Sequence, residues 1–389
     1  MSALASAGLL AFVSACAAVH RPATTVAQLQ RDADEGRVSE QRLRDSVVAR
    51  LVRRVVRRGD KTLDVLMLSG GGQNGSYGAG FLRGWRSRAD SSWPTFDLVT
   101  GISTGALKAP YALVGSVAAI DTLSALYLAA ADRVAPSIDW WSPFRRTGGL
   151  VNTKRYDNTL TQSFNGPFRQ ALQAAFADDR QIVFGTTDMD IGTGRTWAMS
   201  EQLDSTATSL RRTQQLLKAA TAIPGIFPSV VIDGHVHADG GVTTNVLPLL
   251  TLSDYRALNE ALAARGITGV TVRVYVVMNM WAHAEPKIIT PASRKQISAR
   301  TNMMLFYAHQ PQTLELIDAL AHASTAAGVG MRVEAKMVLL PSATALMPGA
   351  DKLFDRRFMA MLDSMGFAKA RHPQMWDSVP SAYARPPLN

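Results

Sequence analysis

Cysteine is almost absent from this chain, because Cys16 is the only one among 389 residues. A single cysteine excludes an internal disulfide framework and a zinc site built from cysteines. Long apolar runs are scarce as well, and the one at residues 3–19 is too short for a comfortable membrane span. With 47% hydrophobic and 19% charged residues, the composition is that of a globular protein with a sizeable core. Disordered and fibrous classes are therefore excluded.

Acidic residues are in the minority. The chain has 41 Lys and Arg against 31 Asp and Glu, which gives a net charge of +10. Such an excess favours anionic partners, either phospholipid headgroups or nucleic acid. Because no nucleic-acid-binding motif accompanies the charge, we expect a membrane surface and no nucleic acid as partner.

The apolar stretch at residues 3–19 is placed like the hydrophobic region of a secretory signal peptide. Its end, Val13-Ser14-Ala15-Cys16, resembles a bacterial lipobox, in which cleavage precedes a lipid-modified cysteine. No lysine or arginine precedes the apolar run, which departs from that pattern, and an ordinary buried cysteine is the alternative. We expect residues 1–16 to be a signal peptide. The protein would then be exported and anchored through Cys16 to a bacterial cell membrane, facing the periplasm or in the outer membrane.

Residues 17–62 are predicted to form a tether followed by a basic amphipathic helix. Residues 20–40 are polar and mixed, which indicates a tether or a loosely packed lead-in. Beyond them, apolar residues recur with helical spacing while arginines lie mostly on the rest of the surface; the apolar stripe is Leu43, Val47, Val48, Leu51, Val52, Val55 and Val56. We expect this helix to dock on the core with solvated arginines, and an anionic membrane surface is the alternative.

From residue 64 onward, apolar runs alternate with helical patterns in a βαβ rhythm. Strands are expected at 64–68, 96–100, 181–187, 230–237, 271–279 and 337–340, and helices at 76–88, 104–117, 310–327 and 353–368. Near-continuous apolar strands fit an α/β fold with a mostly parallel central sheet and helices on both faces. We therefore predict a catalytic domain over residues 63–280, with a C-terminal helical elaboration over 281–389 packed on the same domain.

A Gly-x-Ser-x-Gly sequence, Gly101-Ile102-Ser103-Thr104-Gly105, lies between a predicted strand and a predicted helix. A serine at the apex of such a strained turn is exposed as a nucleophile. The flanking glycines matter because a Cβ there would clash in the crowded turn. The sequence therefore predicts Ser103 as nucleophile, with Gly101 and Gly105 in support.

A glycine-rich loop follows the first predicted strand and contains Gly70, Gly71, Gly72 and Gly75. Its backbone N–H groups can converge on an anion, which in acyl transfer is the tetrahedral oxyanion. The same spacing satisfies the dinucleotide motif Gly-x-Gly-x-x-Gly. However, Asp90, the acid at the expected distance, precedes a turn instead of ending a strand. A Walker loop is excluded because no Gly-Lys-Ser/Thr follows. A dinucleotide-binding enzyme remains a minor alternative.

Asp239 follows the strand predicted at 230–237 and precedes Gly240 and Gly241. A serine hydroxyl needs a base to accept its proton. A carboxylate can act as that base if burial raises its pKa and the hydroxyl lies within hydrogen-bond reach. The two glycines would allow close approach to the serine turn. Because Asp-Gly-Gly is also an ordinary turn sequence, the residues alone leave the role of Asp239 open.

Three ordered motifs together resemble the patatin-like phospholipase family: the glycine loop at 70–75, the serine turn at 101–105, and the stretch 219–228 that leads to 239–245. The similarity covers residues 65–248. It implies a three-layer α/β architecture, lipid acyl hydrolysis by a Ser-Asp dyad without a catalytic histidine, and no metal or organic cofactor. Carried over to this chain, it implies Ser103 as nucleophile and Asp239 as base, with an oxyanion hole from the backbone of Gly70, Gly71 and Gly72.

The chain departs from the family pattern at Asn74, where the loop usually carries Arg or Lys. An amide can donate a hydrogen bond but brings no positive charge, so a phosphate-bearing substrate has less support than carboxylic ester hydrolysis in general.

The second departure is His237, where the family often has tyrosine. His235, His237 and Asp239 share one face of a regular strand, which leaves open a base-assisting histidine or a metal site at the His-x-His pair. We expect His237 to be structural. His309 and His322 follow in the order Ser, Asp, His of α/β-hydrolases, and they too are expected to be structural.

A lipid esterase must admit an acyl chain beside its nucleophile, and Leu107, Tyr111, Ile226 and Phe227 are candidate lining residues. An aromatic loop, residues 140–144 with Trp140, Trp141 and Phe144, could enter a lipid interface or pack under a long connection. We predict a serine acyl hydrolase that cleaves lipid esters through an acyl-enzyme. The alternative from another class is a lipoprotein that binds lipid without turnover.

Overall fold

The computed structural model describes residues 21–90, 92–133, 137–138, 151–164, 166–282, 286, 288–307, 310–326 and 330–379. The predictions for the signal peptide and Cys16, for the aromatic loop at 140–144 and for His309 lie outside these residues. Within the described part of the chain, no helix combines the length and the apolar character needed to cross a membrane.

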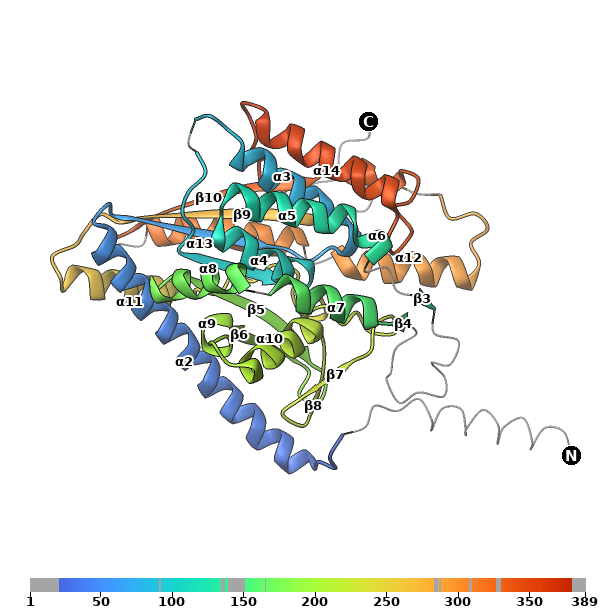
Figure 1. The fold of residues 1–389 in the computed structure, drawn as a ribbon, viewed down its shortest axis with the longest axis horizontal. Helices are drawn as coiled ribbons and strands as arrows, with labels where there is room; N and C mark the ends of the chain where they lie inside the picture. The colour runs from blue at the N-terminus through green and yellow to red at the C-terminus, as the bar shows by residue number, and fades with distance from the viewer. Residues whose placement is uncertain are drawn as a thin grey trace, which may run out of the picture.

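An eight-stranded sheet forms the centre of the described structure (Figure 1). Its order is β10 (Arg332–Leu340), β9 (Thr271–Trp281), β1 (Thr62–Leu68), β2 (Leu98–Ile102), β5 (Gln181–Asp188), β8 (His235–Asp239) and β7 (Val230–Ile232), and β6 (Thr193–Ala198) also pairs with β5. The five strands from β10 to β5 run parallel, whereas β6, β7 and β8 pair antiparallel. A separate two-stranded sheet joins β3 (Ser137–Ile138) to β4 (Val151–Asn152).

Helices cover both faces of the sheet. One core lies under α3 (Gly75–Arg86), α4 (Thr104–Val114), α5 (Val117–Leu128), α6 (Ala130–Arg133), α7 (Lys154–Ser163), α8 (Gly166–Ala177), α9 (Met199–Gln202), α10 (Ala207–Ala220) and α14 (Arg356–Arg371). The other lies under α2 (Val26–Arg58), α11 (Leu252–Ala263) and α13 (Gln310–Ala326). A further helix is α12 (Arg294–Tyr307).

Successive side chains along each strand point to opposite faces of the sheet, which explains why there are two cores. Val274 and Val276 of β9 belong to the core under α2, while Tyr275 and Val277 belong to the core under α3. Both faces of the strand are therefore apolar, as in a sheet covered on both sides. The predicted α/β class, with a mostly parallel central sheet and three layers, is confirmed (Figure 1).

The helix α2 begins earlier than predicted. It starts at Val26, where the Thr25 side chain accepts a hydrogen bond from the backbone N–H of Gln28, so the tether predicted at 20–40 is wrong for residues 26–40. A capped start lets a polar segment of good helix formers continue the amphipathic helix that follows it. The predicted apolar stripe is buried except for Val56, so docking on the core is confirmed.

The arginines of α2 are not uniformly solvated, contrary to the prediction. Arg54 is buried and pairs with Asp97 at 2.8 Å and with Asp178 at 2.5 Å. Three more arginines in the last turns of α2 also form ion pairs with aspartates. We call the whole set the arginine–aspartate network, which comprises Arg53, Arg54, Arg57 and Arg58 with Asp97, Asp178 and Asp179. The network fastens the end of α2 to the amino ends of β2 and β5.

Two predicted elements are each interrupted by a turn. The strand predicted at 230–237 is the hairpin β7–β8, because Asp233 and Gly234 both adopt positive φ and turn the chain. The helix predicted at 104–117 ends at Gly115, which has a φ of 66°, and Ser116 caps the start of α5. Both breaks are local turn signals that an apolar pattern hides.

Candidate active site

Strand register brings two distant segments together. The last residue of β2, Ile102, pairs with Gly185 of β5, and Asp239 at the end of β8 pairs with Thr186, the next residue along β5. The end of β8 thus lies beside β5 where β2 stops. Ser103 follows Ile102 directly, and its Oγ donates a hydrogen bond to Asp239 Oδ2 at 2.6 Å. The structure therefore unites the two residues that the sequence singled out.

The turn at Ser103 is strained and tightly packed. Ser103 has a φ of 52° and a ψ of −122°, a conformation rare for a residue with a side chain. A Cβ on Gly101 would lie 2.5 Å from backbone atoms of Gly105, and one on Gly105 would lie 2.1 Å from the carbonyl oxygen of Leu68. Both glycines are thus required by close backbone approach. Ser103 is 6% exposed and directly precedes α4.

Asp239 is buried without a positively charged partner among the described residues. Its exposed fraction is 4%, and its second carboxylate oxygen accepts the Gly241 N–H at 2.7 Å. Burial raises the pKa of Asp239 to about 6, against the smaller opposing effects of the two hydrogen bonds. Gly240 is required by packing, since a Cβ there would lie 2.6 Å from the carbonyl oxygen of Gly185. A carboxylate with this pKa can accept a proton from the serine hydroxyl near neutral pH.

The glycine loop differs from the prediction at its first residue. The N–H of Gly70 donates to the carbonyl oxygen of Asn245 at 3.1 Å, so Gly70 does not supply an oxyanion donor in this structure. Its role is steric, because a Cβ there would lie 3.0 Å from the Cβ of Ser103. Gly71 and Gly72 have φ values of 153° and 55°, and Gly72 shares a cavity with Ser103. Their N–H groups have no partner within the described residues.

Thr104 is a candidate oxyanion donor that sequence reasoning missed. It is the first residue of α4, where backbone N–H groups have no intrahelical partner. The Gly-x-Ser-x-Gly motif itself carried the signal, because the N–H after the nucleophile commonly completes the oxyanion hole. Gly71, Gly72 and Thr104 are therefore the candidate donors.

Two polar side chains lie buried near the loop. Asn74 is buried, and within the described part of the chain its Oδ1 has no hydrogen-bond partner. Lys108, which sequence reasoning missed, is 0% exposed, and its Nζ donates to the carbonyl oxygen of Gly75 at 3.4 Å. Burial lowers the pKa of Lys108 to about 7. A lysine inside the apolar pattern of α4 was the available signal.

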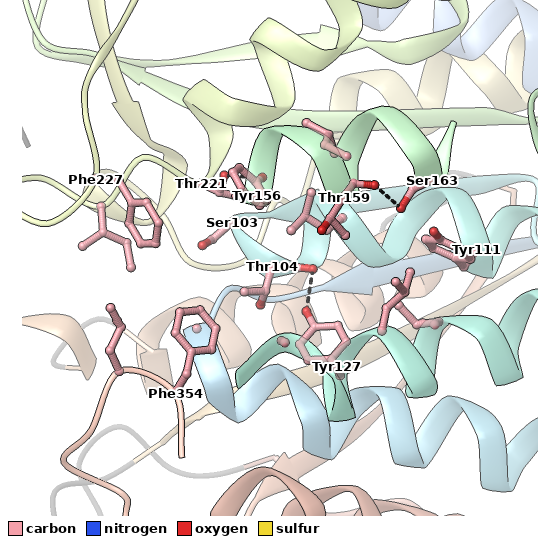
Figure 2. A pocket seen from close by; sticks show the side chains of 18 of the residues that line it. Ser103, Thr104, Tyr111, Tyr127, Tyr156, Thr159, Ser163, Thr221, Phe227 and Phe354 are labelled. Atoms are coloured by element: carbon pink, nitrogen blue, oxygen red, sulfur yellow. Dashed lines mark hydrogen bonds between the residues drawn. The ribbon is translucent and has the colours of Figure 1, made fainter. Parts of the chain in front are cut away.

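An apolar cavity opens beside Ser103 (Figure 2). No residue lining it carries a charged side chain; the lining residues are Gly72, Ser103, Thr104, Leu107, Tyr111, Leu123, Leu126, Tyr127, Ala130, Tyr156, Thr159, Leu160, Ser163, Phe164, Thr221, Ile223, Phe227, Leu353 and Phe354. Leu107, Tyr111 and Phe227 were predicted, whereas Ile226 does not line the cavity. The contributions of α5 and α7 were missed because nothing in the sequence links them to Ser103.

The histidines bind other partners than Ser103. His237 is buried, its Nδ1 lies 3.0 Å from Thr186 Oγ1, and burial lowers its pKa to about 4. His235 lies between Asp188 at 2.7 Å and Asp32 at 3.0 Å; these hydrogen bonds raise its pKa although burial opposes them. Within the described residues, no group of three or more His, Cys, Asp or Glu side chains could hold a metal ion.

Two further candidates from the sequence lie elsewhere. His322 is exposed on α13 and contacts Asp318 of the same helix. Asp90, the acid considered for a dinucleotide site, is exposed and pairs with Arg88 in a turn. Neither residue lies where its alternative function would require it.

Comparison with known proteins bears on the family of this chain. Residues 66–252 match the family model described as patatin-like phospholipase. No sequence among the curated proteins matches the chain. Among solved structures, the crystal structure of VipD from Legionella pneumophila is similar, with 13% sequence identity and a TM-score of 0.36. That match covers 79% of this chain and 66% of the other, slightly less than two thirds of its length.

The family match spans β1 to the start of α11, and so includes the glycine loop, the serine turn and Asp239. Residues 66–252 of this chain thus form a patatin-like phospholipase domain, which supports lipid hydrolysis as the general class of activity.

Proposed function

We propose that the protein is a serine acyl hydrolase that cleaves carboxylic ester bonds of lipids through Ser103 and Asp239. The observation that carries the proposal is the 2.6 Å hydrogen bond between Ser103 and Asp239 at the edge of an apolar cavity. A buried carboxylate without a cation has a raised proton affinity, which suits a base. The cavity suits the apolar chain of a lipid ester.

In the proposed mechanism, Ser103 Oγ attacks the ester carbonyl carbon while Asp239 takes the hydroxyl proton. The carbonyl oxygen becomes an oxyanion, which the N–H groups of Gly71, Gly72 and Thr104 stabilise. Collapse of this intermediate breaks the ester C–O bond, and the leaving alcohol takes the proton from Asp239. The acyl group is then bound to Ser103.

Deacylation repeats these steps with water. Asp239 accepts a proton from the water that attacks the acyl-enzyme carbonyl, and the same oxyanion donors act again. When the bond to Ser103 Oγ breaks, the serine regains a proton from Asp239 and the carboxylic acid leaves. Each proton taken by Asp239 is returned within the same half-reaction, so the cycle needs no metal or organic cofactor.

The proposed setting is a bacterial membrane surface. An exported protein anchored through Cys16 would hold its cavity near lipid, and the net charge of +10 would favour anionic headgroups. A Cys16→Ala variant tests the anchor. Membrane fractionation and labelling with a radioactive fatty acid should show the wild type in the membrane fraction and labelled, and the variant unlabelled. A labelled variant would contradict the proposed anchor site.

One alternative is a lipoprotein that holds lipid in the cavity without turnover. The cavity, which has no charged lining residue, favours lipid binding whether or not catalysis occurs. The two functions differ in whether Ser103 reacts, because only an activated serine forms a covalent adduct with a fluorophosphonate.

The decisive experiment combines covalent labelling with ester hydrolysis. Wild type, Ser103→Ala and Ser364→Ala are treated with a fluorophosphonate and assayed on short-chain esters, long-chain esters and phospholipids. Ser364 is an exposed serine of α14 and serves as the control. We expect labelling and hydrolysis in wild type and Ser364→Ala, and neither in Ser103→Ala. An unlabelled wild type that binds lipid would favour the alternative, and a labelled Ser103→Ala would contradict the assignment.

A further inference from the structure

The apolar cavity follows the axis of α4. Thr104, Leu107 and Tyr111 line it at successive turns on one face of that helix, beginning directly after Ser103. Figure 2 shows Ser103 between Phe227 on one side and Tyr111 with Ser163 on the other. The distance along the helix from Ser103 to Tyr111 is about 12 Å at the usual rise per residue.

A second hollow adjoins the far end of this cavity. Four residues line both spaces, and we call them the partition: Tyr111, Leu126, Thr159 and Ser163. The second hollow extends to residues absent from the first, including exposed Gln162 and the half-buried Phe168. The partition is therefore the boundary between the cavity beside Ser103 and a second hollow that is open to the surface.

Tyr111 is the best-fixed member of the partition. Its side chain is buried, and its ring stacks on Phe168 with ring centroids 4.6 Å apart. Burial raises the pKa of its hydroxyl, against the opposing influence of the neighbouring Ser163. Contacts from both α7 and α8 hold the ring in place, so an apolar chain that enters at Ser103 meets an ordered wall.

We propose that the partition, with Tyr111 as its principal residue, sets the longest acyl chain that the site accepts. This rests on the proposed ester hydrolysis. An extended octanoyl chain is shorter than the helix rise from Ser103 to Tyr111, whereas an extended palmitoyl chain is longer. The ligand class is thus a single unbranched acyl chain of medium length, and removal of the Tyr111 ring joins the two spaces and admits longer chains.

The test measures kcat/KM for acetyl, octanoyl and palmitoyl esters of para-nitrophenol. In Tyr111→Ala, the ratio of palmitoyl to octanoyl activity should rise about tenfold or more, the scale at which apolar pockets discriminate chain length. Tyr111→Phe keeps the ring and should keep the wild-type ratio. Gln162→Ala, which alters the second hollow beside the partition, should keep it as well.

A second variant works in the opposite direction. Leu107 lies one turn beyond Ser103, and Leu107→Trp fills the cavity close to the reacting carbonyl. It should lower octanoyl relative to acetyl activity about tenfold or more. If Tyr111→Ala does not fold, this variant decides: an unchanged ratio overturns the proposal and a lowered one supports it.

The outcomes separate this proposal from the proposed function. A wild type that hydrolyses none of the esters and takes no fluorophosphonate contradicts both. A wild type that hydrolyses the acetyl ester, with the same chain-length profile in folded Tyr111→Ala, overturns the role of the partition alone.

Discussion

Buried aspartates at the two ends of the sheet have different hydrogen-bond and ion-pair partners. At the amino end, Asp97 is fully buried and pairs with Arg54 at 2.8 Å and Arg58 at 2.9 Å. At the carboxyl end, Asp239 is nearly as buried, but its partners are a serine hydroxyl and a backbone N–H. A buried carboxylate is thus neutralised by cations where it supports the fold, and left without them where it can accept a proton.

The pKa values of Asp179 and Asp239 differ in the same way. Burial tends to raise the pKa of Asp179, yet the hydrogen bond and charge of Arg53, together with the charge of Arg57, lower it below its ordinary value. Burial without a cation raises the pKa of Asp239 to about 6. Lys108 is the cationic counterpart at the carboxyl end, because its one hydrogen-bond partner in the described chain is a carbonyl oxygen and burial lowers its pKa to about 7. Asp239 and Lys108 therefore have no ion-pair partner among the described residues.

The largest expected effect concerns catalysis. Asp239→Asn removes the base but keeps the shape, so kcat/KM for a short ester should fall about 10³-fold or more. Asp178→Asn, in the arginine–aspartate network, is the matched control and should leave the activity of the folded protein unchanged. Steady-state kinetics check both variants. Comparable losses of kcat/KM in both variants would contradict a catalytic role for Asp239 that Asp178 lacks.

The next effect concerns stability at the amino end. Arg54→Met leaves Asp97 buried with one fewer cation and should lower the free energy of unfolding by about 3–5 kcal/mol. Denaturant unfolding measures the loss, and specific activity below the transition should be preserved. A loss of unfolding free energy under about 1 kcal/mol would contradict this, because it would mean that the Arg54–Asp97 pair contributes no more than a surface ion pair.

Lys108→Met should raise the free energy of unfolding, whereas Arg54→Met should lower it. The pKa of Lys108 in the folded state is about 7, below its ordinary value of 10.5, so folding favours the neutral amine. Its contribution to stability is present above 10.5 and is lost as the pH falls through 7. The variant should therefore gain about 2–4 kcal/mol of unfolding free energy below neutral pH, and the gain should shrink at alkaline pH. A pH-independent loss of stability would contradict this.

The smallest expected effect is a stability gain in Asp239→Asn. The folded-state pKa of about 6 lies above the ordinary value of 3.8, so the contribution of Asp239 to stability is present below 3.8 and is lost as the pH rises through 6. At mildly alkaline pH the variant should be more stable by about 1–2 kcal/mol. Thermal or denaturant unfolding at two pH values checks this, since the difference should vanish in acid.

The sequence predicted features that depend on residues close together in the chain, and missed those that depend on contacts between distant segments. The glycines around Ser103 and the strand before them form a local pattern, so the turn and its place in an α/β sheet were predictable. The loss of Gly70 as a donor depends on Asn245, and the lining of the cavity depends on Tyr127 and Tyr156, which only folding brings near Ser103. The same holds for the network around Arg54, whose partners come from later segments.

The turn between β7 and β8 was missed for a different reason, although its cause is local in the chain. Asp233 and Gly234 divide an apolar run into β7 and β8, and a run of apolar residues does not reveal where a strand reverses. The reversal matters for the site, because it directs β8 antiparallel to β5 and delivers Asp239 to the end of β2.

The most direct test of the account is the pH dependence of kcat/KM for a short ester in wild type and in His237→Phe. A carboxylate base with a pKa of about 6 predicts activity that falls with one inflection near that value as the pH is lowered, unchanged in the histidine variant. A profile that is flat through this range, or an inflection that disappears with His237, would contradict the assignment of Asp239 as the base for Ser103.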